Sequence, residues 1–305
     1  MNTRRANTWK ARLAGLAALV RSTIAELLGE DDDSPPCLPA GLSDAVKPIV
    51  IEAVHHLMDY QSASYAQLYL DRLKRFVARR NVGDALLADI ARQMAARMSY
   101  EDPIRMAQLK LAEVEIRQNR PQDTFADDVR KLRLDEMVAS LPGKVADPVL
   151  GALEWAGWLH MPVVRRFSTE SRWSIRRLKM EASLRRWRLY SVRYAKERVW
   201  VERWLHMIDR SLIKQPEAVF AVVETATMVQ GYGHFYRQGL AEWHLIIDGL
   251  VKPTFDGALK LKDLAGAIAE ARAAALPDPR HASLKRTIAA IRTRASAGEA
   301  SVAAR

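Results

Sequence analysis

Apolar residues recur every three or four positions along most of the chain, which is the spacing that places side chains on one face of an α-helix. The strongest series lies between residues 45 and 80 and predicts a single long helix with one buried face. That face carries Val54, Leu57, Met58, Gln61, Tyr65, Leu68, Tyr69, Leu73 and Phe76. The motif Asn81-Val82-Gly83 ends this helix, because glycine tolerates the left-handed backbone of a helix end. Asp84 then caps the next helix, and the pattern predicts an all-α fold with long helices.

Proline and capping residues mark further helix boundaries. Asp102-Pro103 and Asp147-Pro148 are typical helix starts, because aspartate accepts free amide hydrogens and proline needs none at the first position. Gln215-Pro216 opens another helix that ends at Gly231, and the last large apolar stripe ends at Pro253.

Two stretches are less regular. Between Ser171 and Ser211 the chain contains no glycine or proline, and the pattern predicts one very long helix or two helices with an unmarked break. From residue 119 to 135 the apolar residues follow no single period, so a short strand or an extended loop is expected there.

These patterns divide the chain into three parts. Residues 1–42 hold an amphipathic helix from about Trp9 to Leu28 and a proline-rich linker. Residues 43–252 form a helical domain. Residues 253–305 make an alanine-rich tail with few large apolar side chains, expected to be helical or disordered.

Positive charge is concentrated in one segment. The chain has a formal net charge of +11, and between Arg165 and Arg198 twelve lysines and arginines face three glutamates. Tryptophans are interleaved with them, and arginine with large aromatics is typical of protein interfaces. Three interpretations stay open: a solvated face or docking surface for an acidic partner subunit, forked donors for a polyphosphate such as coenzyme A, or backbone contacts to nucleic acid. The candidate contact residues are Arg176, Arg177, Arg185, Arg186, Arg188 and Arg193.

Cysteine, histidine and hydropathy exclude several classes of protein. The single Cys37 excludes an internal disulfide, a multi-cysteine zinc site and an iron-sulfur cluster ligated by this chain alone. No histidine pair has metal-site spacing, so neither a metal site nor a catalytic residue is predicted. No apolar run reaches the about 20 residues of a membrane span, and Arg21 interrupts the one signal-like stretch. A cytoplasmic location without membrane contact is expected.

A compact polar group follows the second predicted helix. Tyr100, Glu101, Asp102 and Arg105 bring a phenol, two carboxylates and a guanidinium within six positions. An acid-base site is conceivable, but Asp102 already serves as a helix cap, and such residues in a first helical turn are ordinary helix chemistry. We therefore expect a structural polar cluster.

If this cluster is buried against the long helix, its ionic partners are expected to be Asp71 and Arg72.

Gly231, Tyr232 and Gly233 form a glycine-flanked loop. Glycines allow a main chain to pass close to a ligand, but such a pair more often ends one helix and turns into the next. The loop matches neither the dinucleotide-binding fingerprint nor a P-loop.

Three groups of short motifs resemble a known family. The first contains Tyr60-Gln61, Tyr65-Ala66 and Leu68-Tyr69-Leu70-Asp71-Arg72-Leu73. The second contains Tyr100-Glu101-Asp102, Ile104-Arg105 and Lys110, and the third contains Gly231-Tyr232-Gly233, Arg237 and Gly239-Leu240. Together, over roughly Ser43 to Leu250, they resemble the helical C-terminal region of the indolepyruvate ferredoxin oxidoreductase beta-subunit family. Pro103 departs from the pattern, which has an aliphatic residue there.

The resemblance implies a role in a larger enzyme. That family helps to convert an aryl 2-oxo acid, coenzyme A and oxidised ferredoxin into acyl-coenzyme A, carbon dioxide and reduced ferredoxin. Thiamine diphosphate and iron-sulfur clusters are then expected only on a partner alpha subunit, with coenzyme A as a substrate of the complex. Only about forty residues precede the matching region, too few for the family's α/β domain. A separate gamma-type α/β subunit is expected to supply it.

The sequence therefore predicts an accessory helical domain or subunit, without catalytic activity alone, associated with ferredoxin-dependent oxidative decarboxylation of indolepyruvate or another aryl 2-oxo acid. The alternatives are a basic helical protein that binds nucleic acid or another partner, and an inactive remnant of a split gene.

Overall fold

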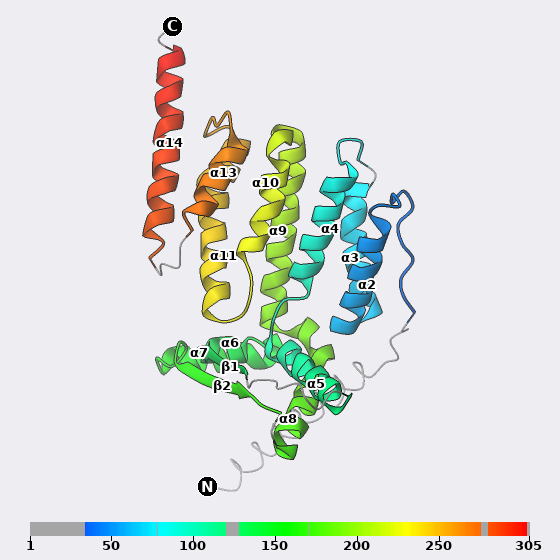
Figure 1. Cartoon of the computed structure of the whole chain (residues 1–305). Helices are drawn as coiled ribbons and strands as arrows, with labels where there is room; N and C mark the ends of the chain where they lie inside the picture. The colour runs from blue at the N-terminus through cyan, green and yellow to red at the C-terminus, as the bar shows by residue number, and fades with distance from the viewer. Residues whose placement is uncertain (1–33, 78, 120–127, 170, 276–279, 304–305) are drawn as a thin grey trace, which may run out of the picture.

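A computed structural model describes residues 34–77, 79–119, 128–169, 171–275 and 280–303. Figure 1 shows an upright bundle of helices standing on a smaller base. The bundle contains α2 (Lys47–Tyr60), α3 (Ala63–Val77), α4 (Asp84–Met98), α9 (Val192–Lys214), α10 (Val219–Glu224), α11 (His234–Ile246), α12 (Lys252–Phe255), α13 (Leu264–Ala273) and α14 (Ala282–Ala303). The predicted all-α fold is confirmed.

The base is built from the segment between α4 and α9. It contains α5 (Pro103–Asn119), β1 (Asp128–Arg133), α6 (Leu134–Val138), α7 (Gly143–Trp155), β2 (Pro162–Phe167), α8 (Arg172–Ser183) and the 3-10 helix η1 (Leu184–Tyr190). The two strands pair antiparallel, with Asp128 opposite Phe167 and Arg133 opposite Pro162. The strand expected between residues 119 and 135 is therefore present as β1.

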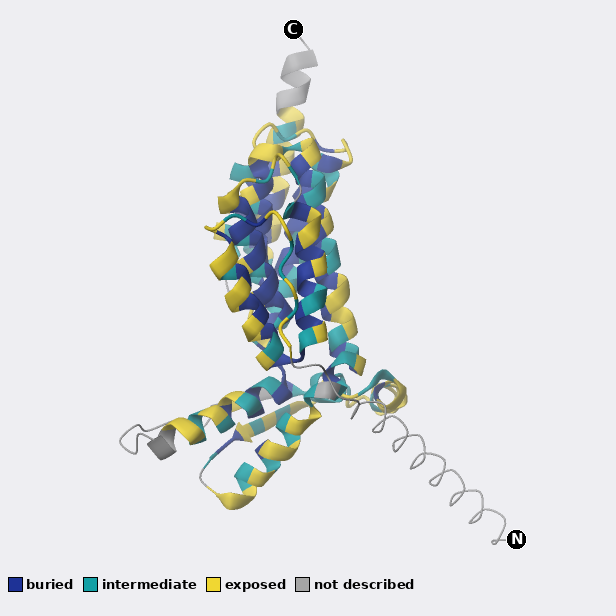
Figure 2. Ribbon diagram, turned by 90° about the vertical axis from the view of Figure 1, so that its right-hand side faces the viewer, coloured by how far each residue is buried: buried dark blue, intermediate teal, exposed yellow. Residues whose placement is uncertain are grey.

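The main hydrophobic core lies inside the bundle, where Figure 2 shows an unbroken column of buried residues. Trp204, Trp243, Tyr69 and Phe76 are among its largest fully buried side chains. Burying one such side chain contributes about 1.5 to 3 kcal/mol through the hydrophobic effect, so this column supplies most of the drive to fold. The base has only a small buried cluster of its own, around Phe167 and Leu178.

The predicted helix over residues 45–80 is two helices. The backbone breaks at Gln61, where φ is −138° and ψ is −73°, and α2 and α3 then pack against each other. The Ser62 hydroxyl accepts a hydrogen bond from the Tyr65 amide at 3.3 Å and so caps α3. Both helices keep the same apolar period, which is why the pattern reads as continuous.

The segment from residue 171 to 211 forms two helices with a break between them, which is the second of the two forms expected for it. The 3-10 helix η1 separates α8 from α9, and Ser191 restarts the helix by accepting a hydrogen bond from the Tyr194 amide at 3.0 Å. A capping serine thus marks the break.

Several predicted boundaries are wrong. Pro148 lies inside α7, which begins after Pro142, whose carbonyl accepts the Ala146 amide. Gly83 was expected to end the preceding helix in the left-handed conformation. Its φ is −78°, in the extended region, and it lies directly before α4.

Two other prolines do not act as expected. Pro216 opens a 3-10 turn (Pro216–Ala218) before α10, and the stripe expected to end at Pro253 continues through a π-helical turn, Ile247–Val251, into α12.

The alanine-rich tail is helical and packed. Leu284, Ile288 and Ile291 of α14 are buried in the main core, together with apolar residues of α13. A Cβ placed on Gly249 would lie 2.9 Å from Ile288 Cγ2, so α14 approaches the π-helical turn closely. The helix predicted from Trp9 to Leu28 lies outside the described residues.

Replacing Ile288 with alanine tests whether α14 belongs to the core. The side chain is 7% exposed, and its truncation should lower the free energy of unfolding by about 2 to 5 kcal/mol. The exposed Arg286 of the same helix is the control, and Arg286→Ala should change stability by less than about 0.5 kcal/mol. Urea unfolding followed by circular dichroism measures both, and equal midpoints for Ile288→Ala and the parent would contradict this packing.

Candidate functional site at the junction of bundle and base

A buried polar network lies where the bundle meets the base. Its side chains come from the C-terminal ends of α2 and α4, the connection between α4 and α5, η1 and the first turns of α9. These segments are far apart in the sequence and meet only in the folded chain.

Arg188 is the centre of this network and is 1% exposed. Its Nε and Nη2 donate to the two carboxylate oxygens of Asp102 at 2.7 and 3.1 Å. Its Nη1 donates to the Tyr60 carbonyl at 2.6 Å and to Gln61 Oε1 at 3.1 Å, and the guanidinium lies 3.9 Å from the centre of the Tyr60 ring. Burial alone would lower the pKa of Arg188, but Tyr60 and Asp102 raise it, so the guanidinium stays charged.

Asp102 has two roles. Besides binding Arg188, its Oδ1 accepts a hydrogen bond from the Arg105 amide at 2.6 Å, which confirms the predicted cap of α5. The Arg105 side chain instead reaches Asp59, at 3.0 Å.

The ionic partners expected for this cluster are wrong. Arg72 pairs with Glu202 of α9 at 2.8 Å, and the exposed Asp71 pairs with Lys74 of its own helix at 2.9 Å. The face of α3 that carries Arg72 packs toward α9, so neither residue reaches Asp102. The structure thus brings Tyr100, Asp102 and Arg188 together and leaves Asp71 and Arg72 apart.

A second buried ion group lies beside the first. Glu197 binds Arg97 at 2.7 Å and Arg193 at 2.9 Å. The guanidinium of Arg193 lies 3.4 Å from the centre of the Tyr236 ring, and Arg97 lies over Trp200 at 4.9 Å. Burial would lower the pKa of Arg193, but Glu197 together with Tyr236, Tyr100 and Tyr232 raises it above its ordinary value.

The arginine-rich segment is therefore divided. Arg188 and Arg193 are buried, so the interpretation as a surface ligand site is wrong for these two. Arg176 is exposed, Arg185 is half-buried, and Arg177 donates to the Arg166 carbonyl at 2.7 Å. Nothing is described for the Arg186 side chain.

Sequence reasoning missed Arg97 and Glu197. An arginine between Met94 and Met98 on the apolar face of α4 was a signal of a buried cation. The spacing of Arg193 and Glu197, one helical turn apart, was a signal of their pairing.

Buried tyrosines surround the network. The Tyr60 hydroxyl donates to the Tyr100 carbonyl at 2.9 Å, and that of Tyr65 donates to the Met98 carbonyl at 2.8 Å. Burial raises the pKa of these phenols, because a phenolate would lose its hydration. The affected residues are Tyr60, Tyr65, Tyr69, Tyr100, Tyr232 and Tyr236.

A cavity of about 470 Å³, here named the junction cavity, is lined by Glu101, the sequence neighbour of Asp102. The two sequence motifs Tyr100-Glu101-Asp102 and Gly231-Tyr232-Gly233 meet here, because Glu101, Gly231 and Tyr232 all line it. The remaining lining residues are Thr227, Met228, Gln230, Phe235, Gln238, Gly239, Glu242 and Ala275.

The glycines of the loop shape this cavity. Gly231 and Gly233 have φ values of 73° and 69°, a conformation that disfavours other residues and that turns the chain into α11. A Cβ on Gly239 of α11 would lie 2.0 Å from the Met228 carbonyl oxygen, so only glycine lets the 3-10 turn Thr225–Met228 lie directly on α11. The expected turn between two helices is confirmed.

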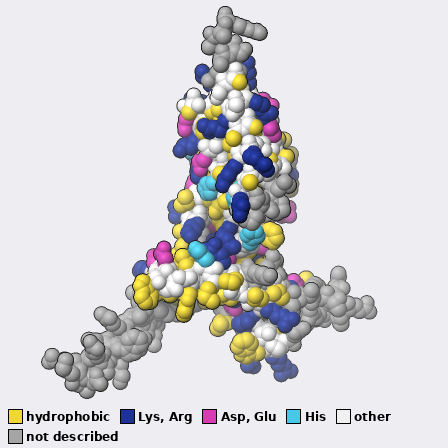
Figure 3. All heavy atoms as spheres, turned by 90° about the vertical axis from the view of Figure 1, so that its left-hand side faces the viewer, with side chains coloured by type: hydrophobic (Ala, Val, Ile, Leu, Met, Phe, Trp, Pro, Cys, Tyr) yellow, Lys and Arg dark blue, Asp and Glu magenta, His cyan; other side chains and the backbone are white. Residues whose placement is uncertain are grey.

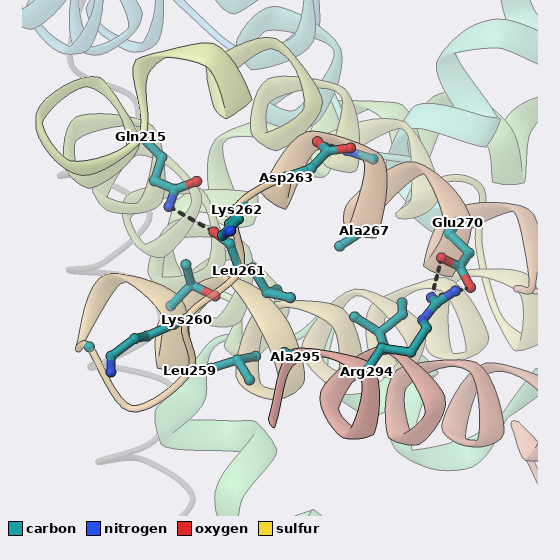
Figure 4. Close-up of a pocket in the computed structure, with 14 residues that line it drawn as sticks. Gln215, Leu259, Lys260, Leu261, Lys262, Asp263, Ala267, Glu270, Arg294 and Ala295 are labelled. Atoms are coloured by element: carbon teal, nitrogen blue, oxygen red, sulfur yellow. Dashed lines mark hydrogen bonds and ion pairs between the residues drawn. The ribbon is translucent and has the colours of Figure 1, made fainter. Parts of the chain in front are cut away.

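A larger cavity of about 1030 Å³, the distal cavity, lies at the end of the bundle away from the base. Figure 4 shows it between α13, α14 and the segment that precedes α13. Leu259, Leu261 and Ile291 give it apolar walls, and Arg294 forms an ion pair with Glu270 at 2.6 Å on its rim.

Within the ranges described above, no three histidine, cysteine, aspartate or glutamate side chains group together in a way that could hold a metal ion. The described helices include none with the length and apolar character needed to cross a bilayer.

The chain belongs to a protein family of unknown function (DUF6537), whose model matches residues 46–249. This region includes the whole base, the buried network and all of the junction cavity except Ala275. No curated protein and no solved structure matches the chain.

Replacing Asp102 with alanine removes the partner of a buried cation. The free energy of unfolding should fall by about 3 to 5 kcal/mol, because Arg188 keeps its charge without a counterion. Loss of a helix cap alone would lower it by only about 1 kcal/mol. Asp71→Ala is the matched control, since Asp71 is exposed and its pair contributes less than about 1 kcal/mol. Chemical unfolding measures both variants, and similar losses would contradict the central role of Asp102.

The buried tyrosines make stability fall in alkali. The unfolded chain releases phenol protons near pH 10, whereas the folded chain retains them to higher pH because the pKa of each buried phenol is raised. Their contribution is therefore complete below pH 10 and declines above it.

The urea midpoint should decrease between about pH 9 and 11, and tyrosinate absorbance should rise together with unfolding. Tyr69→Phe removes one of these groups and should make the decrease shallower. Complete ionisation of all eight tyrosines while the protein stays folded would contradict the burial of these phenols, since the exposed Tyr190 is expected to ionise without unfolding.

Proposed function

We propose that this protein is an accessory helical domain or subunit that binds a partner subunit in a complex for ferredoxin-dependent oxidative decarboxylation of an aryl 2-oxo acid. In this proposal it has no catalytic activity alone. Its base attaches to the thiamine-dependent alpha subunit, which holds the thiamine diphosphate and the iron-sulfur clusters. A gamma-type α/β subunit completes the complex, and coenzyme A is its substrate.

The observation that carries this proposal is a surface of exposed apolar side chains on the base. Trp155 is 91% exposed, Trp173 is 70% exposed and Val164 is 64% exposed. Figure 3 shows hydrophobic side chains gathered along the base. This base surface contains Val129, Leu141, Val145, Val149, Trp155, Trp158, Met161, Val164, Trp173, Met180, Leu184 and Tyr190. Large exposed apolar patches indicate interaction sites, and tryptophan is enriched where protein interfaces are strongest.

Charge on the base surface favours an acidic partner. Arg172, Arg176 and Lys179 are exposed on α8, the helix that also carries Trp173 and Met180. Arginine beside aromatic residues is typical of protein interfaces, and opposite charge on the partner speeds association and fixes orientation.

The buried network supports an accessory role. The carboxylate of Asp102 is bound by Arg188 and by the Arg105 amide, and Glu197 is bound by two arginines. Groups held in this way maintain packing between helices, whereas an acid-base catalyst has to exchange protons with a substrate.

Nucleic acid is the alternative partner. Electrostatic binding to a phosphate backbone needs many free cations, and two of the six candidate arginines, Arg188 and Arg193, are buried in ion pairs. The tryptophans of the base surface favour a protein partner, although aromatic rings can also stack on unpaired bases.

Co-purification with the thiamine-dependent alpha subunit of an indolepyruvate oxidoreductase tests the proposal. The full chain should bind this subunit and should show no turnover of indolepyruvate by itself. Trp155→Ser combined with Trp158→Ser should weaken the complex by more than about tenfold, equivalent to about 1.4 kcal/mol. The control is Ile213→Ser with Phe220→Ser, which removes exposed apolar side chains from the bundle and should leave binding unchanged.

Two results would contradict the proposal. One is equal affinity of both double variants for the alpha subunit. The other is absence of binding to the alpha subunit together with salt-dependent binding to RNA or DNA, which would favour the alternative.

A further inference from the structure

We infer that the junction cavity is a binding site for a small organic cation with an ammonium group. The ammonium would lie at Glu101 and Tyr232, and the apolar part of the molecule would lie against Phe235 and Met228. This inference does not rest on the proposed function, because it uses neither the base surface nor a partner subunit.

The charge of the cavity is opposite to that of the chain. Glu101 and Glu242 line it, and none of the described residues that line it is a lysine or arginine, although the whole chain has a formal net charge of +11. A concave acidic surface with walls of low dielectric constant raises the local concentration of positively charged ligands.

Glu101 is a carboxylate without a partner in the described part of the chain. Its Oε2 is buried and accepts no hydrogen bond from the described residues, and none of them forms an ion pair with it. The adjacent Asp102 has its carboxylate fully occupied by Arg188 and a backbone amide. A buried carboxylate oxygen costs free energy unless it is paired, so Glu101 is suited to accept a donor from a ligand.

Tyr232 supplies a second unused polar group. It is 5% exposed, and its hydroxyl has no hydrogen-bond partner among the described residues. A phenol can accept a hydrogen bond from an ammonium group, which has three donors to distribute. The Tyr232 hydroxyl is closed to solvent, so in this proposal the side chain turns toward the cavity and becomes an acceptor beside Glu101 and water.

Glu242 is less available than Glu101. Its Oε1 lies 3.3 Å from His281 Nδ1 and accepts a hydrogen bond from Gln238 at 3.1 Å. His281 has a φ of 50°, an uncommon conformation for a residue other than glycine. This contact partly satisfies Glu242, so Glu101 is the main anion for a ligand.

The apolar side chains in the lining, Phe235 and Met228, favour an organic ligand over an inorganic ion. Phe235 is 70% exposed and lines the cavity, where an aromatic ring can attract a cation and also cover its carbon chain. A volume of 470 Å³ corresponds to about fifteen non-hydrogen atoms at the density of water, a fit for a small metabolite. Calcium prefers six or more oxygen ligands. The carboxylates of Glu101 and Glu242 do not provide such a set, because Glu242 is already bound by Gln238 and His281.

Calorimetric titration of the full chain with 2-phenylethylamine tests this inference. The amine is protonated at pH 7, and 2-phenylethanol is a neutral molecule of similar size and shape. The amine should bind at least about tenfold more tightly than the alcohol. Glu101→Gln should reduce amine affinity by at least about tenfold, and Tyr232→Phe should reduce it severalfold.

Matched controls separate binding from folding and from general charge. Glu115→Gln removes the same charge from an exposed position on α5 and should leave affinity unchanged. Glu101→Gln should melt at or above the temperature of the parent, because the lost carboxylate has no partner among the described residues. Magnesium and calcium at millimolar concentration should not displace the amine.

Several outcomes would overturn the inference. They are absence of amine binding up to about 10 mM, equal affinity for amine and alcohol, equal affinity of Glu101→Gln and the parent, and displacement of the amine by a divalent cation.

Discussion

The guanidinium of Arg188 is the group on which the arrangement of bundle and base depends. A cation removed from water costs several kcal/mol unless its donors are satisfied with good geometry. Its donors reach Asp102, the Tyr60 carbonyl and Gln61, and only one relative placement of α2, α5 and η1 satisfies them together. The ion pair therefore specifies orientation more than it adds to stability, since an apolar cluster of equal volume would stabilise the fold as well.

Around this pair the chain separates its charges by location. Arginines that are close in sequence have different surroundings: Arg188 and Arg193 are inside, whereas Arg172 and Arg176 are outside beside Trp173. The net charge of the chain consequently overstates the positive charge available to a partner. The junction cavity has an acidic lining, and its Glu101 is the sequence neighbour of Asp102, the residue that binds the buried Arg188. The family model covers the network, the base and every described lining residue of the cavity except Ala275, which places them in the shared part of the family.

The fold class and the local caps could be predicted because they depend on neighbours in sequence. Apolar period indicated helices, and Asp102-Pro103 indicated the start of α5, since capping involves residues one turn apart. The partner of Asp102 could not be predicted in the same way, because Arg188 is 86 residues away and many arginines compete for the role. The break at Gln61 was missed because α2 and α3 share one period, although Ser62 was a capping signal. The position of the tail in the core was missed because alanine-rich helices pack through close approach, as Ile288 does over Gly249.

The positions of Asp102 and Arg188 have one more consequence. They stand at the two ends of the continuous segment that forms the base, and α4 and α9, which flank that segment, contact each other directly. The base is thus an insertion in a bundle whose neighbouring helices already meet. Such an insertion can lengthen, shorten or exchange its outer surface during evolution while its entry and exit points remain fixed by one ion pair. Relatives with an identical bundle could in this way acquire different partners.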